Sequence, residues 1–319
     1  MKAIMYHYVR GETDRPPNYY YLDLTDFRRQ LDYFEDNFGF ISKEEFLNFI
    51  RDDRSEVPSG IVLTFDDGLK DHYEVVYPEL KKRGLWGIFY VPTGPYREGQ
   101  LLDVHRIHSL LGKVSGSELL RQAQDIVDEN MIPHERREEY RKETYKNQED
   151  TESTKQVKRI LNFFVADKYQ TEVIDRLISQ IGYEEPDITD FYLTGREMRE
   201  MHEDGQVIGG HTVTHPVLSK LNKEEQRREI KESLDYLDKV VDRLSEWTFC
   251  YPYGSSYTFN EHTLSLLDEV NCEWCFKVES SDIDKSDINN RPQALPRYDC
   301  TEFPDGEASG SIGPSTAVD

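Results

Sequence analysis

The stretch IVLTFDDGLKD, residues 61–71, combines the signs of a buried strand with those of a charged site. Five mostly apolar residues, Ile61–Phe65, predict a strand, and two adjacent carboxylates, Asp66 and Asp67, follow it directly. Like charges in neighbouring positions repel each other, and burying either one alone is costly. We therefore expect a positive group close to the end of this strand.

Six further segments resemble strands, and segments with helical spacing separate most of them. Together with residues 61–65 they make about seven short, apolar strands. This alternation is typical of an α/β protein with a largely parallel sheet. The six further segments are the N-terminal run Met1–Val9 and the segments Ile88–Val91, Gln206–Ile208, Thr248–Tyr251, Glu273–Val278 and Ala294–Tyr298.

Several helices can be located by the residues that cap their first turn. The segments Ser42–Glu45 and Thr194–Glu197 are capping boxes, in which the first and fourth side chains satisfy backbone N–H groups reciprocally. Further helices are predicted to begin after Thr25, Asn222 and Asn260.

One long region interrupts this alternation of strands and helices. Residues from about 101 to 190 are densely charged and contain no convincing strand, so we predict a helical insertion there. It could be a solvated outgrowth or a lid over a substrate. The last stretch, residues 305–319, is small, polar and glycine-rich and is predicted to be disordered. We expect a single domain over residues 1–304 that carries the insertion.

The charge balance excludes some classes of partner. Among 319 residues, 62 are acidic and 39 basic, and the net charge of −23 argues against binding to nucleic acid or to anionic membrane surfaces. No apolar run approaches the roughly 20 residues that span a bilayer. Residues 1–9 lack the apolar core and cleavage site of a signal peptide, which predicts a cytoplasmic protein. The oligomeric state is left open.

Two of the four cysteines have the spacing of a metal-binding motif. Cys272 and Cys275 form a CxxC pair, to which Cys250 and Cys300 could add two ligands for a structural metal. Because the pair lies inside an apolar, strand-like run, we interpret the two residues as ordinary buried thiols.

The segment IGGHTVTH, residues 208–215, supplies candidate partners for the paired aspartates. His211 and His215 lie four residues apart, directly after a predicted strand. Pro216 disfavours helical dihedrals at His215, so we expect a tight loop at the carboxyl end of that strand. Two imidazoles and one carboxylate form a triad with open positions, which suits Zn²⁺ or a similar divalent ion.

Three motifs, each beside a predicted strand, resemble those of a known family. TFDDG (residues 64–68), HTVTH (211–215) and YPYG (251–254) are similar in type and order to the motifs of the NodB-type polysaccharide deacetylases, carbohydrate esterase family 4. The resemblance covers most of residues 1–300 apart from the insertion. It implies a distorted (β/α) barrel, which agrees with about seven strands and places catalytic groups at the carboxyl ends of the strands.

The resemblance also implies the roles of individual residues. Asp67, His211 and His215 would bind a divalent ion, zinc being preferred over cobalt, nickel, manganese or iron. Asp66 would act as the general base toward a metal-bound water that attacks the N-acyl group of an amino sugar. The backbone N–H of Tyr253 would help to stabilise the charge that develops on the carbonyl oxygen.

Two positions depart from the family pattern. Cys250 stands where the third motif begins with an arginine that orients the base, and Arg297 stands where the last motif has a histidine that protonates the departing amine. Arginine cannot act as an acid, because its pKa exceeds about 12. We hypothesise that Arg297 orients Asp66 or binds an anionic group of the substrate. The alternative is an ordinary ion pair at the surface.

The departing amine must then take its proton from another group. Asp66 itself or a histidine such as His105 could supply it. We consider four residues as candidates for lining the substrate pocket: His7, His105, Tyr251 and Pro252.

The sequence therefore predicts a metal-dependent N-deacetylase that acts on an N-acylated amino sugar. The expected cytoplasmic location favours a glycan precursor, either nucleotide-linked, lipid-linked or a free sugar, over a polymer. A deformylase or another small-molecule amide hydrolase on the same metal site is one alternative. A catalytically inactive, carbohydrate-binding barrel is the other; the intact aspartates and histidines argue against it, and the two departures argue for it.

Overall fold

The computed structural model describes residues 1–11, 19–51, 56–138 and 150–308. The chain divides into two compact units, each of which is described by itself. The first comprises residues 1–12, 21–100 and 188–308, and the second comprises residues 13–20, 101–187 and 309–319. Most of the tail for which disorder is predicted, from residue 309 onward, lies outside the described residues.

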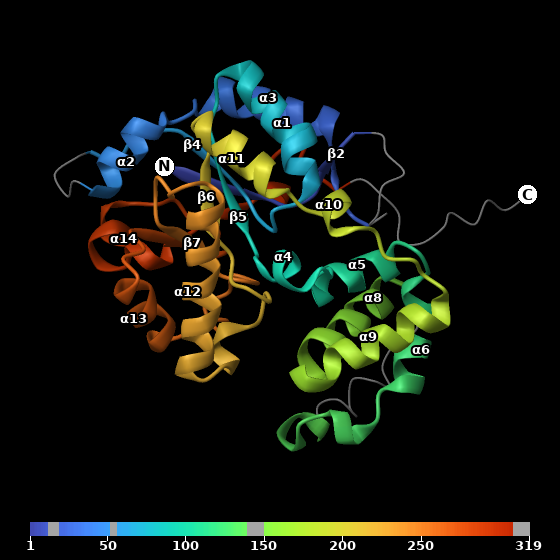
Figure 1. Ribbon diagram of the computed structural model, residues 1–319. Helices are drawn as coiled ribbons and strands as arrows, with labels where there is room; N and C mark the ends of the chain where they lie inside the picture. Colours follow the sequence, from blue (N-terminus) through green and yellow to red (C-terminus); the bar gives the residue numbers. More distant parts are fainter. Residues whose placement is uncertain (12–18, 52–55, 139–149, 309–319) are drawn as a thin grey trace, which may run out of the picture. The chain divides into compact units, whose positions relative to one another are not determined.

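A sheet of seven parallel strands forms the centre of the first unit (Figure 1). Their order across the sheet is β8-β7-β6-β5-β4-β1-β9. The sheet is curled into a half-barrel surrounded by helices, which confirms the predicted α/β barrel fold. The strands are β1 (Lys2–Tyr6), β4 (Ile61–Phe65), β5 (Gly87–Val91), β6 (Val207–Gly210), β7 (Thr248–Cys250), β8 (Trp274–Phe276) and β9 (Tyr298–Asp299).

The last strand-like segment contacts β8 at one edge of this sheet and pairs with β1 at the opposite side, where it forms the other edge. Leu295 forms a parallel bridge with Phe276 of β8, whereas Tyr298 pairs with Ile4 of β1. The regular strand therefore begins later than the predicted segment 294–298, because its first half pairs with a different neighbour. This arrangement brings the residues between the two contacts, including Arg297, to the inner side of the curved sheet, where Arg297 is fully buried.

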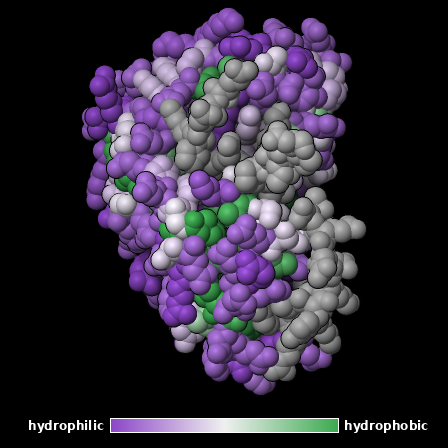
Figure 2. Space-filling view, turned by 90° about the vertical axis from the view of Figure 1, so that its right-hand side faces the viewer, coloured by the Kyte–Doolittle hydropathy of each residue, from purple (hydrophilic) through white to green (hydrophobic). Residues whose placement is uncertain are grey.

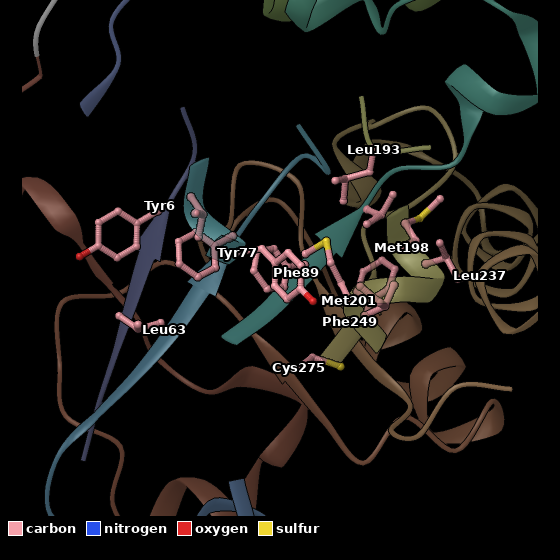
Figure 3. Packing of buried hydrophobic residues seen from close by; sticks show 14 of the residues in the cluster. Tyr6, Leu63, Tyr77, Phe89, Leu193, Met198, Met201, Leu237, Phe249 and Cys275 are labelled. Carbon is pink, nitrogen blue, oxygen red and sulfur yellow. The ribbon is translucent and has the colours of Figure 1, made fainter. Parts of the chain in front are cut away.

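Alternate strand residues belong to two separate apolar cores. On β4, Leu63 packs in a core that also contains residues of the surrounding helices, part of which Figure 3 shows. Its neighbour Val62 packs in a second core, formed by the inner faces of six strands and by Phe46 and Phe49 of one helix. Both faces are buried, as expected of a parallel sheet, and this explains why the strands are apolar throughout.

Helices cover the outer face of the sheet and follow the strands along the chain (Figure 1). The predicted capping boxes at Ser42 and Thr194 are present, and the helix predicted to begin after Asn222 also has one. The first helix is capped by Asp23 instead of Thr25, since the Asp23 carboxylate accepts the Thr25 N–H. The α-helices of this unit are α1 (Leu24–Asn37), α2 (Lys43–Arg51), α3 (Tyr77–Arg83), α4 (Gly94–Glu98), α10 (Ile188–Phe191), α11 (Gly195–Glu203), α12 (Lys223–Val240), α13 (Glu261–Glu269) and α14 (Lys285–Asn290). A two-stranded parallel sheet, β2 (Val9–Arg10) and β3 (Leu22–Asp23), completes it.

The second unit is helical in the part that the structure describes, and it has its own apolar core. Arg106 is buried there and forms ion pairs with Asp103, Asp175 and Glu185. The longer helices are α5 (Asp103–Leu111), α6 (Gly116–Ile126), α8 (Asp150–Arg159) and α9 (Asp167–Ile181).

One face of the molecule agrees with the highly charged composition (Figure 2). Figure 2 shows a face on which hydrophilic residues predominate. Among the described residues, no helix is both long and apolar enough to cross a membrane. All four cysteines are free, and neither Cys272 nor Cys275 belongs to a group of described residues that could hold a metal ion.

Candidate active site

The two aspartates of the opening stretch lie at the carboxyl end of β4, in a strained turn. The Asp66 N–H still donates to the carbonyl of Tyr6 on β1, at 2.9 Å, whereas Asp67 has a φ of 77°, which is unusual for a residue other than glycine. Gly68 follows with a φ of 59°, and a Cβ at that position would lie 2.8 Å from Cγ1 of Val91. The glycine is therefore required for this turn to pack against β5.

His211 and His215 meet Asp67 at the same edge of the sheet. Their Nε2 atoms lie 3.4 and 3.5 Å from Oδ1 of Asp67. The Nδ1 atom of His211 lies 2.8 Å from the carbonyl oxygen of Cys250. Because a carbonyl oxygen can only accept, Nδ1 carries the proton and Nε2 of His211 is left as a metal ligand.

These distances fit a shared divalent ion. Ligand atoms about 2.0–2.2 Å from a tetrahedral zinc ion are about 3.4 Å apart. All three side chains are buried, and their ligand atoms lie within 4.8 Å of one another. Burial lowers the pKa of the His211 imidazole, but nearby Cys250 and the Asp67 and Asp66 carboxylates together raise it well above its usual value. The site thus favours a positive charge.

A second group, Asp66, His211 and Cys250, also has its possible ligand atoms within 4.8 Å of one another. It is less suited to a metal ion, for two reasons. The Asp66 carboxylate is already paired with Arg297, and burial raises the pKa of the Cys250 thiol, which disfavours the thiolate that a metal requires. Asp67, His211 and His215 are the better ligand set.

Arg297 holds the carboxylate of Asp66 with two parallel hydrogen bonds. Its Nη1 and Nη2 atoms lie 2.8 and 2.7 Å from Oδ1 and Oδ2, and Nη1 also donates to the hydroxyl of Thr64. The side chain is fully buried, so an ordinary ion pair at the surface is wrong. Burial alone would raise the pKa of Asp66, but the guanidinium outweighs burial and lowers it to about 2. Asp66 is therefore ionised near neutral pH.

The surroundings of Arg297 explain how the guanidinium fits inside the barrel. Its Nη2 atom lies 2.8 Å from Sγ of Cys250, and its Cζ atom lies 5.8 and 5.6 Å from the ring centres of Tyr90 and Phe276. The small thiol of Cys250 thus faces the space that the guanidinium occupies. The rings pack on a delocalised cation favourably.

The motif that follows β7 contributes one residue to the rim of the site and one to the core. The Tyr253 ring lies 5.0 Å from that of His215, and the residue is 40% exposed with a φ of 62°. The Tyr251 ring is buried and stacks on Phe259, and its hydroxyl donates a hydrogen bond to the carbonyl oxygen of Gln293. Tyr251 therefore packs in the outer core, because strand alternation turns it away from the inner side. Pro252 is also buried.

Two histidines are candidates for lining the pocket. His7 follows β1, is partly exposed, and lies close enough to Asp66 to act on its pKa, after the larger effects of burial, Arg297 and His211. Its carbonyl oxygen accepts a hydrogen bond from Nε2 of His72, at 2.9 Å. His105 is buried in α5 of the second unit, and a role for it stays a prediction.

Sequence reasoning gave no role to His72 or Glu229, which both support the site. Burial lowers the pKa of His72 to about 4, so its neutral ring donates from Nε2. Glu229 of α12 accepts hydrogen bonds from the loop between the two candidate metal ligands. A single histidine after the aspartates and one glutamate in a highly charged helix carry no pattern by which the sequence would single them out.

Comparisons with known proteins agree with the fold. The family model described as polysaccharide deacetylase matches residues 53–273. The Streptococcus pyogenes deacetylase PplD, solved in complex with acetate, has a TM-score of 0.57 at 19% identity, over 94% of this chain and 91% of that one. IcaB from Ammonifex degensii has a TM-score of 0.53 at 16% identity, over 93% and 90%. A de-N-acetylase from Aggregatibacter actinomycetemcomitans has a TM-score of 0.53 at 15% identity, over 93% of each chain. Among curated proteins, no relative by sequence was found.

Proposed function

This chain belongs to the polysaccharide deacetylase family, and we propose that it removes the N-acetyl group from an amino sugar of a glycan by means of a divalent metal ion. The observation that carries the proposal is the convergence of three buried side chains on one point, with both imidazole Nε2 atoms 3.4 and 3.5 Å from the Asp67 carboxylate. Two nitrogen ligands and one oxygen ligand favour zinc.

Asp66 is the proposed general base. A divalent ion held by Asp67, His211 and His215 would lower the pKa of bound water to about 7 and polarise the acyl carbonyl. A weakly basic carboxylate is then sufficient to accept the proton. Arg297 keeps Asp66 ionised and fixes the plane of its carboxylate, so that the base does not have to be reoriented for each turnover.

The departing amine needs a proton donor, for which we propose His7. Arg297 cannot release a proton, and its contact with Asp66 makes the protonated form of that carboxyl unfavourable near neutral pH. His7 is partly exposed at the end of β1, next to the strand that carries Asp66, and its imidazole acts electrostatically on that carboxyl. His72 holds the main chain at His7 in place.

The rim residue Tyr253 is proposed to serve in two ways. Its backbone N–H would donate to the oxygen on which charge develops, and its exposed ring, beside His215, would contact the sugar. The acetyl group is favoured because the family acts on acetylated polysaccharides and because PplD was solved with acetate. A glycan precursor as the substrate, and a cytoplasmic location, stay predictions from the sequence.

The test combines metal analysis with product analysis. We expect about one zinc per chain in purified protein, and acetate release from some member of a panel of N-acetylated amino sugars, both free and polymeric. Asp66→Asn is the matched control, because it keeps the shape of the side chain. It should retain zinc but lose activity by a factor of about 10²–10⁴. Formate released without acetate would favour a deformylase, and zinc-free protein that binds glycans without turnover would favour an inactive barrel.

A further inference from the structure

The loop that joins the two candidate imidazole ligands has an unfavourable backbone conformation. Thr212 has a φ of 66° and His215 a φ of 61°, and neither is glycine. A residue with a side chain in this left-handed region costs about 1–2 kcal/mol. Two such residues within five positions persist only if the surrounding structure holds them.

Glu229 of α12 holds this loop through both of its carboxylate oxygens. Oε2 accepts the N–H groups of Val213 and Thr214, at 2.7 and 2.9 Å, and Oε1 accepts the Thr214 hydroxyl at 2.8 Å. Within the loop, the hydroxyl of Thr212 accepts the N–H of His215 at 2.9 Å. The N–H groups of three consecutive residues that end in a candidate ligand are thus all directed to acceptors.

The position of Glu229 is fixed by the packing of its helix. Ile230 and Leu234 of α12 pack in the outer core, and a Cβ at Gly210 would lie 3.0 Å from Cδ2 of Leu234. The helix therefore rests against the end of β6, the strand that leads into His211 (Figure 1). A carboxylate anchored in this way has a defined position relative to the ligand that follows the strand.

The contacts of Glu229 are not those of a charge pair. Within the described ranges, no lysine or arginine is recorded in a salt bridge with it, in contrast to Glu232 on the same helix, which pairs with Arg97. Burial raises the pKa of Glu229, and the hydrogen bonds from Thr214 and Val213 oppose this effect. The partly buried carboxylate of Glu229 accepts its hydrogen bonds from this loop, and we interpret its role as ordering the loop.

We propose that Glu229 is a positioning residue of the metal site, which sets the angle between the His211 and His215 imidazoles by holding the loop between them. The inference rests on the proposed function, because it assumes that both histidines are ligands. His211 is also fixed by the carbonyl of Cys250.

The experiment measures zinc affinity, not turnover. Apoprotein of the full chain is titrated with Zn²⁺ in competition with a chromogenic chelator, and the visible spectrum of the Co²⁺-substituted protein reports the coordination geometry. Glu229→Ala should raise the Kd for zinc by about 10–100-fold, the usual effect of removing a partner behind a metal ligand. The Co²⁺ bands should also shift. Glu232→Gln, a surface change on the same helix, should leave both readouts unchanged.

A conservative variant separates positioning from charge. In Glu229→Gln the amide oxygen can still accept the two backbone N–H groups, and the Thr214 hydroxyl can turn to accept from the amide nitrogen. Zinc affinity should therefore fall by less than in Glu229→Ala. If Glu229→Gln bound zinc as weakly as Glu229→Ala, the negative charge of Glu229, and not its hydrogen bonds to the loop, would account for the loss of affinity. That result would overturn the proposal.

Two further outcomes would contradict the inference. The first is a Glu229→Ala variant that binds zinc with the affinity of the wild type, even if its apoprotein is less stable in urea.

The second outcome applies if Glu229→Ala does not fold. Zinc affinity is then measured in Glu229→Gln and Thr214→Val, since loss of one hydrogen bond should weaken zinc binding by up to about tenfold. Wild-type affinity in both overturns the proposal. Wild-type protein that binds no zinc would instead overturn the proposed function itself.

Discussion

Replacing Arg297 by methionine tests how the proposed base is held, because it removes the cation and keeps much of the apolar stem. Arg297 is 0% exposed and Asp66 is 2% exposed, so little solvent screens the pair. Asp66 has a pKa of about 2 in place of its ordinary 3.8, which corresponds to about 2 kcal/mol. Burial opposes that shift, so the guanidinium itself contributes more. Removing one partner of a buried pair costs about 3–5 kcal/mol, and we expect Arg297→Met to lose that much stability near pH 7.

The pH dependence of this loss has a defined sign. In the wild type, the pKa of Asp66 is lowered, so the stability it contributes is fully present above about pH 4 and is lost as the pH falls toward 2. In Arg297→Met, burial loses its largest opposing effect and raises the pKa of Asp66 relative to the wild type, while the smaller lowering effects of His211 and His7 remain. The variant should therefore recover stability relative to the wild type as the pH falls from about 7 toward that raised value.

The assay is urea unfolding of the apoproteins at two pH values, with Asp66→Asn and the double variant completing a double-mutant cycle. We expect a coupling of at least about 2 kcal/mol between the two residues. A coupling near zero, or a stability loss at pH 7 below about 0.5 kcal/mol, would refute the reasoning.

Arg297→Lys keeps the charge but cannot form both parallel hydrogen bonds, so it should lower kcat/KM. Wild-type kinetics in that variant would show that the bidentate contact does not orient the base.

Three further predictions concern the metal, the proton donor and the rim. Chelation followed by dialysis should abolish activity, and added Zn²⁺ should restore it; activity that survives in demonstrably metal-free protein would contradict the assigned ligands. His7→Gln should lower kcat by about 10²-fold or more without changing the zinc content, and an unchanged kcat would remove His7 from the mechanism. Gly254 has a φ of 65°, and a Cβ there would lie 2.3 Å from Cγ2 of Val278. Gly254→Ala should therefore cost about 1–3 kcal/mol more in urea unfolding than Gly99→Ala, because Gly99 has a φ of 68° with nothing within 4 Å. Equal losses would show that the close contact is relieved without cost.

The candidate ligand set could be proposed from the sequence because each of its parts has a local signature. An apolar strand that ends in Asp66 and Asp67 creates an electrostatic conflict, and a pair of histidines after another strand offers a way to resolve it. In a parallel sheet, the carboxyl ends of the strands meet at one edge. The chemistry of the residues and the fold class together therefore bring Asp67, His211 and His215 to one place.

Contacts between distant parts of the chain, in contrast, required the tertiary structure. Arg297 and Asp66 lie 231 positions apart, and no spacing rule relates them. The sequence left open whether Arg297 faced Asp66, an anionic group of the substrate, or solvent. The curvature of the sheet decided it, since the segment that touches both β8 and β1 turns this side chain inward.

Strand register and helix packing decided the remaining assignments. Alternation along β7 places Cys250 on the inner side and turns the next residue, Tyr251, into the outer core. Glu229 looks like any other acid of a charged helix until α12 is docked on β6. The sequence alone thus determined which residues are candidates for a metal site and at which edge of the sheet they meet. Only the tertiary structure decided which side chains orient the residues of this site. Orientation depends on sheet curvature, strand register and helix packing, and these are properties of the whole barrel.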